Sequence, residues 1–267
     1  MPLPPLSRRK LLHGVVACRE ASPGTGTGQP PLILLHGLGG ASPSWENQLD
    51  HFGQTRRVVA WDCPGYGGSD DLLNPTPDLD EFAAALAELL GAIGVEQADI
   101  VGHSMGGAIA PRFAIRNPGR VRRLVLSCTR AGFRQRDPGS FAQRVAELKT
   151  LSAEEFGRRR AESMTSPAAP EAVRSKVASI AAEARLSGYE AAVHMLMHAD
   201  NTDLLGELEV PTLVLSATDD RVATAAEAEH LTGLIAGAKH VVIEGAGHAP
   251  YLEKPDTYNM ILEDFLS

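Results

Sequence analysis

Short runs of apolar residues, each ending at a polar residue or a glycine, recur along the chain. Each run is too short for an ordinary helix, and its apolar residues follow one another instead of alternating with polar ones. Such runs are typical of strands that are buried on both faces of a parallel sheet. The pattern predicts six of these strands, at residues 31–36, 57–62, 98–102, 121–127, 210–216 and 239–244. It also predicts a hairpin ahead of them, with a turn near Gly14.

Helical patterns lie between the predicted strands. Ser42 and Pro43 supply a capping residue and a first-turn proline for one helix, and Pro118 follows the end of another. The predicted helices cover residues 43–52, 79–93, 108–117, 223–235 and 255–266. Strands that alternate with helices indicate a doubly wound, mostly parallel sheet, so the predicted fold class is α/β.

The alternation stops between residues 130 and 208. This stretch contains no strand pattern, whereas Val173, Val177 and Ile180 have the spacing of one helix face. Loops without secondary structure rarely exceed about 15 residues, so the stretch is more than a loop. We therefore expect residues 1–129 and 209–267 to form one core, with residues 130–208 as a helical cap, or lid, inserted into it.

Composition restricts the classes of partner. The 267 residues are 43% hydrophobic and 22% charged, which is typical of a globular chain, and the net charge of −8 argues against a nucleic-acid partner. Three widely spaced cysteines indicate reduced thiols in the cytoplasm, and no apolar run is long enough to cross a membrane. Residues 7–12 look like a twin-arginine export signal, but the apolar stretch at residues 15–18 is too short to complete one. We expect a small-molecule substrate, and the composition gives no indication of oligomeric state.

The motif Gly102-His103-Ser104-Met105-Gly106 lies between a predicted strand and a predicted helix. A nucleophile on a sharp strand-to-helix turn requires small neighbours, because the backbone folds tightly there. The alternative is a glycine-rich turn in which Ser104 only caps the helix. We interpret Ser104 as a nucleophile, and such a hydroxyl needs a base.

His248 is the candidate base, in a loop between the last predicted strand and the last predicted helix. Asp220 follows the strand at residues 210–216 and is the candidate acid that orients His248. Its neighbour Asp219 competes for that role. The chain order nucleophile, acid, base distinguishes this arrangement from other serine-triad lineages.

Two backbone amides are expected to form an oxyanion hole. One belongs to Met105, directly after the nucleophile, and the other to Leu38 in the loop after the first parallel strand. The glycines of this loop lack the spacing of a nucleotide-binding fingerprint, and the chain has no P-loop motif.

The remaining histidines weigh less as site residues. His36 and His103 lie inside glycine motifs and are expected to shape the backbone. His194 and His198 are four positions apart and are interpreted as part of the cap or surface in preference to a metal site. We predict that neither a metal nor an organic cofactor is required.

The cap is expected to supply an apolar pocket. Its candidate lining residues are Phe133, Phe141, Met195 and Met197. Arg130, Arg134 and Arg136 could attract a carboxylate-bearing substrate, although solvated surface arginines are the commoner interpretation.

From about Leu11 to Leu266 the chain resembles the α/β-hydrolase fold family. The resemblance rests on His36-Gly37, on Asp62-Cys63-Pro64-Gly65-Tyr66-Gly67-Gly68-Ser69, on Gly102-His103-Ser104-Met105-Gly106-Gly107, and on Asp220 and Gly247-His248. It implies an α/β-hydrolase fold with an inserted helical lid and a Ser-Asp-His serine hydrolase. Within the family the chain looks most like compact lidded esterases, 3-oxoadipate enol-lactonase-like members and cofactor-free perhydrolases.

The resemblance also separates the candidate reactions. Haloalkane and epoxide chemistry needs an aspartate where Ser104 stands. Carbon–carbon bond hydrolases of aromatic degradation share the Ser-Met-Gly-Gly stretch, but they usually carry a proline in the first glycine loop and a tryptophan after the catalytic histidine. In this chain the loop reads Leu38-Gly39-Gly40-Ala41, with Gly40 at the position of the proline, and Ala249 follows His248. The hypothesis is therefore hydrolysis of a carboxylic ester or lactone of a small, largely apolar substrate through an acyl-enzyme. The alternatives are carbon–carbon bond hydrolysis of a ring-fission product and a non-catalytic ligand-binding protein.

Overall fold

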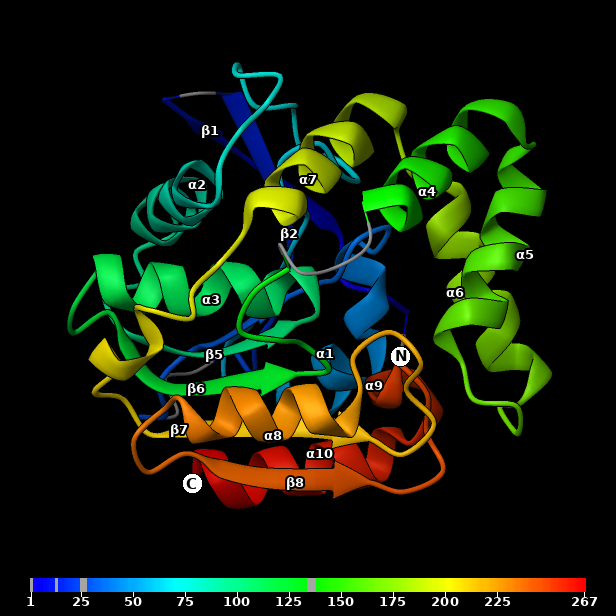
Figure 1. The fold of residues 1–267 in the computed structure, drawn as a ribbon. Helices are drawn as coiled ribbons and strands as arrows, with labels where there is room; N and C mark the ends of the chain where they lie inside the picture. The colour runs from blue at the N-terminus through cyan, green and yellow to red at the C-terminus, as the bar shows by residue number, and fades with distance from the viewer. Residues whose placement is uncertain (1, 13, 25–27, 134–137) are drawn as a thin grey trace.

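An eight-stranded sheet forms the centre of the molecule (Figure 1). The structure is a computed structural model and describes residues 2–12, 14–24, 28–133 and 138–267. The strand order is β1-β2-β4-β3-β5-β6-β7-β8; β1, β2 and β4 pair antiparallel, and all later neighbours pair parallel. The strands are β1 Leu6–Leu11, β2 Gly14–Ala21, β3 Leu32–Leu35, β4 Val58–Trp61, β5 Ala98–His103, β6 Val121–Ser127, β7 Thr212–Ala217 and β8 Lys239–Ile243. The predicted α/β fold class is confirmed, and the first hairpin turns at Gly14.

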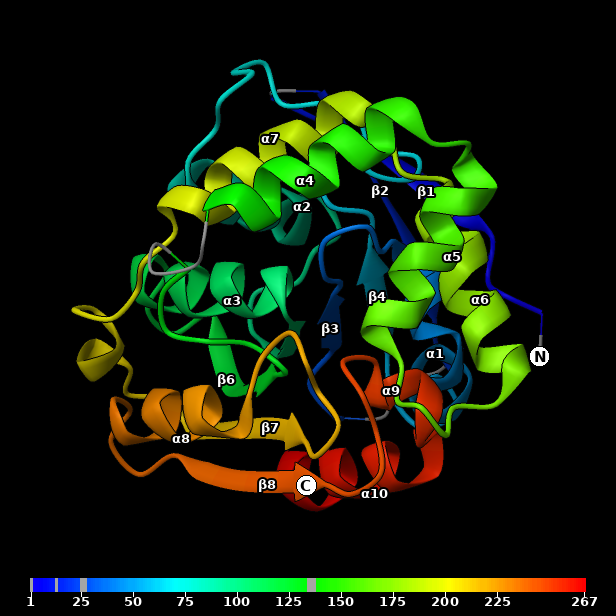
Figure 2. The ribbon, with the colours of Figure 1, turned by 45° about the vertical axis from the view of Figure 1, so that its right-hand side comes forward.

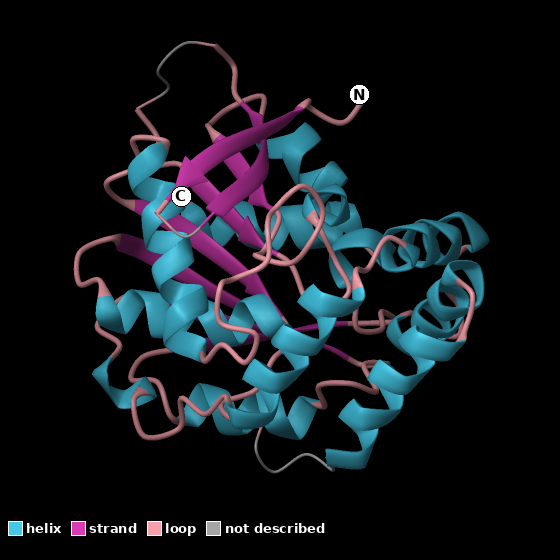
Figure 3. Ribbon diagram, turned by 90° about the horizontal axis from the view of Figure 1, so that it is seen from above, coloured by secondary structure: helices cyan, strands magenta, loops and turns pink. Residues whose placement is uncertain are grey.

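Helices lie on both sides of this sheet, as the view from above shows (Figure 3). They are η1 Ser42–Trp45, α1 Glu46–Phe52, α2 Leu79–Ala92, α3 Met105–Arg116, α8 Ala225–Gly233, α9 Pro250–Glu253 and α10 Pro255–Leu266. Reciprocal capping boxes begin α2, through Asp78 and Glu81, and α8, through Thr224 and Glu227. The short helix α9 was not predicted, and α3 begins at Met105 instead of residue 108.

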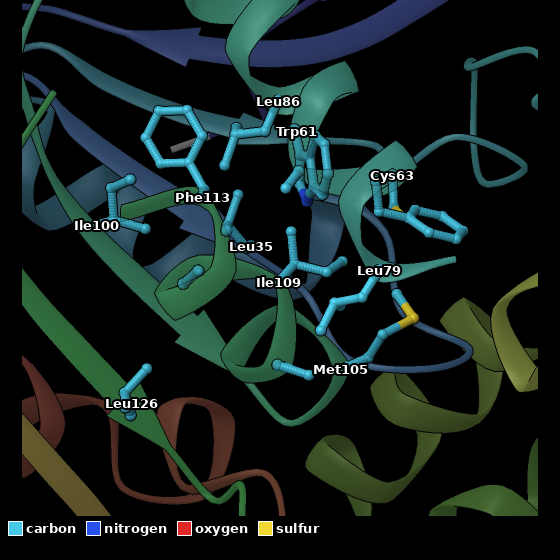
Figure 4. Close-up of a cluster of buried hydrophobic side chains, with 14 of the residues drawn as sticks. Leu35, Trp61, Cys63, Leu79, Leu86, Ile100, Met105, Ile109, Phe113 and Leu126 are labelled. Atoms are coloured by element: carbon cyan, nitrogen blue, oxygen red, sulfur yellow. The ribbon is translucent and has the colours of Figure 1, made fainter. Parts of the chain in front are cut away.

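Each parallel strand contributes to two cores because successive side chains point to opposite faces. Ile33 and Leu35 of β3 belong to the cluster that contains Leu86 of α2 and Phe113 of α3. Figure 4 shows part of this cluster. Leu34, the residue between Ile33 and Leu35, belongs to the other cluster, with residues of α1 and α10. The uninterrupted apolar runs in the sequence thus reflect burial on both faces.

Four helices occupy the chain between β6 and β7, where the sequence lacks strand patterns. They are α4 Pro138–Thr150, α5 Ala153–Met164, α6 Glu171–Ala182 and α7 Leu186–His198, and the short η2 Leu205–Glu207 follows. Helix α4 packs on α7, and α5 packs on α6 (Figure 2). A Cβ atom on Gly188 of α7 would lie 2.0 Å from the Gly65 carbonyl oxygen, so α7 lies directly against the loop after β4. The function of these helices as a cap, and the boundaries given above for it, stay predictions.

Within the described ranges, no helix is both long enough and apolar enough to cross a bilayer.

Candidate active site

Ser104 lies on a strained turn between β5 and α3. Its φ of 50° and ψ of −110° are unusual for a residue with a side chain. A Cβ on Gly102 would lie 2.4 Å from the carbonyl oxygen of Gly106, and a Cβ on Gly106 would lie 2.4 Å from that of Leu35. Both glycines are therefore required by the close approach of backbone to backbone, which explains the spacing of the motif.

His248 lies in the loop after β8 and is paired with a carboxylate. Its Nδ1 atom is 2.8 Å from Oδ2 of Asp220. Oδ1 of Asp220 accepts hydrogen bonds from the amides of Val222 at 2.7 Å and Ala223 at 2.9 Å, so the turn itself holds the carboxylate. The amide of Asp219 donates to the Ala246 carbonyl, and its carboxylate lies beside the Thr218 hydroxyl. Of the two adjacent aspartates, Asp220 is the one at the histidine.

The environment of Asp220 favours its charged form. Burial by itself raises the pKa of this carboxyl, but the charge of His248 and the hydrogen bonds from His248, Ala223 and Val222 together outweigh burial. The pKa of Asp220 consequently lies below its ordinary value. With Asp220 as the partner of Nδ1, Nε2 of the imidazole is the atom left to exchange a proton.

Two further residues hold the His248 loop, and sequence reasoning did not identify their roles. Nε2 of His103 donates to the carbonyl oxygen of His248 at 2.7 Å. The Glu253 carboxylate accepts from the amide of Gly247 with one oxygen and from the amide of Ser166 with the other, both at 2.9 Å. Glu253 thereby joins the histidine loop to the segment that links α5 and α6. Its only signal in the sequence is an acidic residue in a turn, which is too common to be informative.

One of the two predicted oxyanion amides belongs to the loop after β3, and the other belongs to the first residue of α3. Leu38 lines the same cleft as Ser104, and Met105 is the first residue of α3. Across the described ranges neither amide donates a hydrogen bond to another backbone carbonyl. His36 shapes the first loop, because its Nε2 accepts from the Cys63 amide at 3.0 Å and its Nδ1 lies 2.9 Å from the Gly37 carbonyl oxygen.

A narrow cleft joins Ser104 and His248 to the helices that follow β6. It has a volume of about 380 Å³, including the space at its open mouth. Its lining comprises Gly37, Leu38, His103, Ser104, Phe133, Phe141, Arg144, Arg160, Met164, Leu196, Val222 and His248. In the described part of the chain no hydrogen bond connects the Ser104 hydroxyl to His248, which is common in the absence of substrate. Larger hollows elsewhere contain neither residue.

The structure places the predicted pocket residues in different locations. Phe133 and Phe141 line the cleft, whereas Leu196 does so in place of its neighbours. Met195 is buried in the main core, and Met197 lines a separate hollow on the outside of α4 and α7. One helical turn exposes only one of three consecutive residues to the cleft, and the sequence does not show which. His194 shares the hollow of Met197, outside the cleft.

The arginines of the cleft also differ from those proposed from the sequence. Arg130 forms an ion pair with Glu227 and donates to the Val222 carbonyl, which makes it part of the framework. Arg134 and Arg136 lie outside the described residues. Arg144 and Arg160 line the cleft instead. The sequence does not distinguish an arginine that faces the cleft from one on the solvent side of the same helix.

One group of side chains has the composition of a metal site. The potential ligand atoms of His103, Cys128 and His248 lie within 4.8 Å of one another. Hydrogen bonds engage one ring nitrogen of each histidine, Nε2 of His103 and Nδ1 of His248, and burial raises the pKa of the Cys128 thiol well above its ordinary value. A neutral thiol is a poor ligand, so the buried Cys128 argues against a metal at this position.

Comparison with known proteins agrees with this arrangement of strands, turn and loop. Residues 30–255 match the family model described as alpha/beta hydrolase fold. The 2-hydroxy-6-oxononadienedioate/2-hydroxy-6-oxononatrienedioate hydrolase of Paraburkholderia phymatum is 29% identical over 275 residues, which cover 96% of this chain and 93% of the relative. The pimeloyl-(acyl-carrier protein) methyl ester esterase of Aeromonas hydrophila is 28% identical over 247 residues, which cover 89% and 95%.

A solved structure has the same fold. The enol-lactonase from Burkholderia xenovorans superposes with a TM-score of 0.90 at 23% identity, covering 97% of this chain and 99% of that one. The family model spans most of the chain, and the structural match extends over nearly all of it. The protein is therefore a hydrolase that belongs to the α/β-hydrolase fold family.

Proposed function

We propose that this protein is a serine hydrolase that cleaves a carboxylic ester or lactone through an acyl-enzyme. The observation that carries the proposal is the Asp220–His248 hydrogen bond of 2.8 Å at one cleft with Ser104, whose strained turn presents the hydroxyl. An esterase among the relatives supports the same reaction class. Ser104, His248 and Asp220 are the proposed nucleophile, base and orienting acid.

The proposed reaction proceeds in two halves. Ser104 Oγ attacks the substrate carbonyl carbon while His248 Nε2 accepts the hydroxyl proton, and the new oxyanion is bound by the amides of Leu38 and Met105. The carbon–oxygen bond to the leaving alcohol then breaks, and His248 returns the proton to that oxygen. In the second half His248 activates a water molecule, which attacks the acyl carbon and releases Ser104.

The second candidate reaction is cleavage of a carbon–carbon bond, because one relative is named as an oxononadienedioate hydrolase. Carbon–carbon cleavage of a vinylogous diketone would use the same three residues on a different bond. Turnover of a short nitrophenyl ester and of a ring-fission product by the same preparation distinguishes the two. A much larger kcat/KM for the ring-fission product would replace the ester assignment.

The nucleophile is tested by labelling with a fluorophosphonate and by turnover of nitrophenyl esters. We expect the Ser104→Ala variant to lose both, and the His248→Gln variant to lose most of each. Ser179→Ala, on the exposed side of α6, is the matched control and should retain both. Labelling or turnover that persists without Ser104 contradicts the proposed function.

A further inference from the structure

Arg160 occupies an unusual position for a charged side chain. On α5 the inward face carries Phe156, Gly157, Arg160 and Ala161, which follow the helical repeat. Arg160 is only 8% exposed and lines the cleft that contains Ser104 and His248. An arginine side chain that is almost fully buried therefore lies in the wall of the cleft that contains the proposed nucleophile.

The neighbouring arginines behave differently. Arg158 pairs with Glu155 and Glu162 of its own helix, and Arg159 pairs with Glu155 and with Glu147 of α4. Throughout the parts of the chain that the structure describes, no ion pair or side-chain hydrogen bond is formed by the Arg160 guanidinium. A buried charge without a counterion costs free energy, so its retention in a site indicates that a ligand supplies the opposite charge.

Two other groups extend the positive region. Arg144 of α4 enters the same cleft, and its guanidinium lies 5.8 Å from the centre of the Phe141 ring. Burial raises the pKa of Tyr189, the charges of Arg160 and Arg144 oppose that rise, and the charge of Glu147 adds to it. The Tyr189 hydroxyl is buried and, within the described residues, has no hydrogen-bond partner.

We propose that Arg160, assisted by Arg144, binds a free carboxylate of the substrate, so that the ester or lactone cleaved at Ser104 is also an acid. The planar guanidinium donates two parallel hydrogen bonds to a carboxylate, which fixes the position of the distant scissile carbonyl. Phe133, Phe141 and Leu196 contact the apolar part between the two ends. This inference rests on the proposed function for its choice of substrate, but the guanidinium can also be tested by binding alone.

The kinetic test uses mono-nitrophenyl esters of succinic, glutaric and adipic acids. Each is compared with the same ester in which a primary amide replaces the free carboxylate. We expect the wild-type protein to prefer the acid, and the Arg160→Met variant to lose about 10- to 100-fold in kcat/KM toward the acid, mainly through KM. Turnover of the amide should fall far less than turnover of the acid, and fluorophosphonate labelling of this variant reports that it is folded and that Ser104 is competent.

Arg160→Lys and Arg159→Met complete the set. The lysine keeps the charge without the planar fork and should recover part of the preference. Arg159→Met removes an equally long cation from the outer side of the same helix and should leave both substrates unaffected. Equal losses toward acid and amide, or no preference for the acid in the wild type, would overturn the assignment of Arg160 while leaving the serine mechanism intact.

Binding of glutarate separates this inference from the proposed function. Isothermal titration should give binding to the wild-type protein and to Arg159→Met, and at least tenfold weaker binding to Arg160→Met. That result would stand even if no ester were cleaved. Equal affinity of wild type and Arg160→Met for glutarate, or Arg160-dependent binding of inorganic phosphate in preference to glutarate, contradicts a carboxylate site.

Discussion

Oδ2 of Asp220 lies 2.8 Å from Nδ1 of His248, although 28 positions separate the two residues. The hydrogen bond selects the tautomer of His248 that carries its proton on Nδ1 and leaves Nε2 able to accept one. We expect Asp220→Asn to reduce kcat for ester hydrolysis by about 10³- to 10⁴-fold, because an amide stabilises neither that tautomer nor the imidazolium. Asp219→Asn is the matched control and should change kcat little. Comparable losses in the two variants would mean that the neighbouring carboxylates share the role.

The backbone is packed so tightly at the turn of Ser104 that we expect one added methyl group to destabilise it. In Gly106→Ala the new Cβ would lie 2.4 Å from the Leu35 carbonyl oxygen, so the turn or β3 must shift. We expect a loss of about 1–3 kcal/mol in the free energy of unfolding and a reduced kcat. In Gly91→Ala, within α2, the new Cβ would have no other atom within 4 Å, and the gain in helix propensity should raise stability by up to about 1 kcal/mol. Urea unfolding of both variants measures the contrast.

We expect the Glu253 carboxylate to support stability and activity, because it links the histidine loop to the segment between α5 and α6. In Glu253→Gln one carboxylate oxygen becomes an NH₂ group facing an amide N–H of Gly247 or Ser166. Loss of that hydrogen bond in a buried position should cost about 1–3 kcal/mol of unfolding free energy and lower kcat. Glu244→Gln, on the exposed surface next to the same loop, should be neutral. Unchanged urea midpoint and kcat in Glu253→Gln would show that the bridge contributes nothing.

We expect the free energy of unfolding to depend on pH through the buried His103 side chain. Burial, followed by the charge of His248, lowers its pKa from 6.5 to about 3 in the folded protein. Between these values the unfolded chain binds the proton that the folded chain excludes, so stability is full above pH 6.5 and falls as the pH drops toward 3. His103→Gln cannot charge and should show a shallower loss of stability over this range.

The measurement is the urea midpoint at several pH values from about 7, above the ordinary pKa of 6.5, down to about 4. His36 also has a pKa lowered by burial and remains in the variant, so part of the acid sensitivity should persist. His230→Gln, exposed on α8, serves as the control. Identical pH profiles for the wild type and His103→Gln would contradict a neutral buried His103.

The sequence predicted the strands, most of the helices between the parallel strands and the tight turn at Ser104 because these depend on local patterns. Apolar runs mark buried strands wherever they occur, and the glycines around Ser104 are needed for contacts within a few residues or with the adjacent strand. The short helix α9 carries no such pattern, so Glu253 was not recognised. Met195 and Met197 were predicted to line the cleft and Leu196 was not, since helical rotation relative to the cleft depends on how α7 packs.

The sequence by itself determined that one α/β core is interrupted by a helical stretch, and it indicated which residue types supply the chemistry. Only the tertiary structure decided which aspartate meets His248, which arginine enters the cleft and how the histidine loop is tied down. The reason is physical: side-chain periodicity and backbone strain are properties of neighbouring residues. The Asp220–His248 and Ser166–Glu253 contacts bring together residues 28 and 87 positions apart, and such distances depend on how whole elements pack.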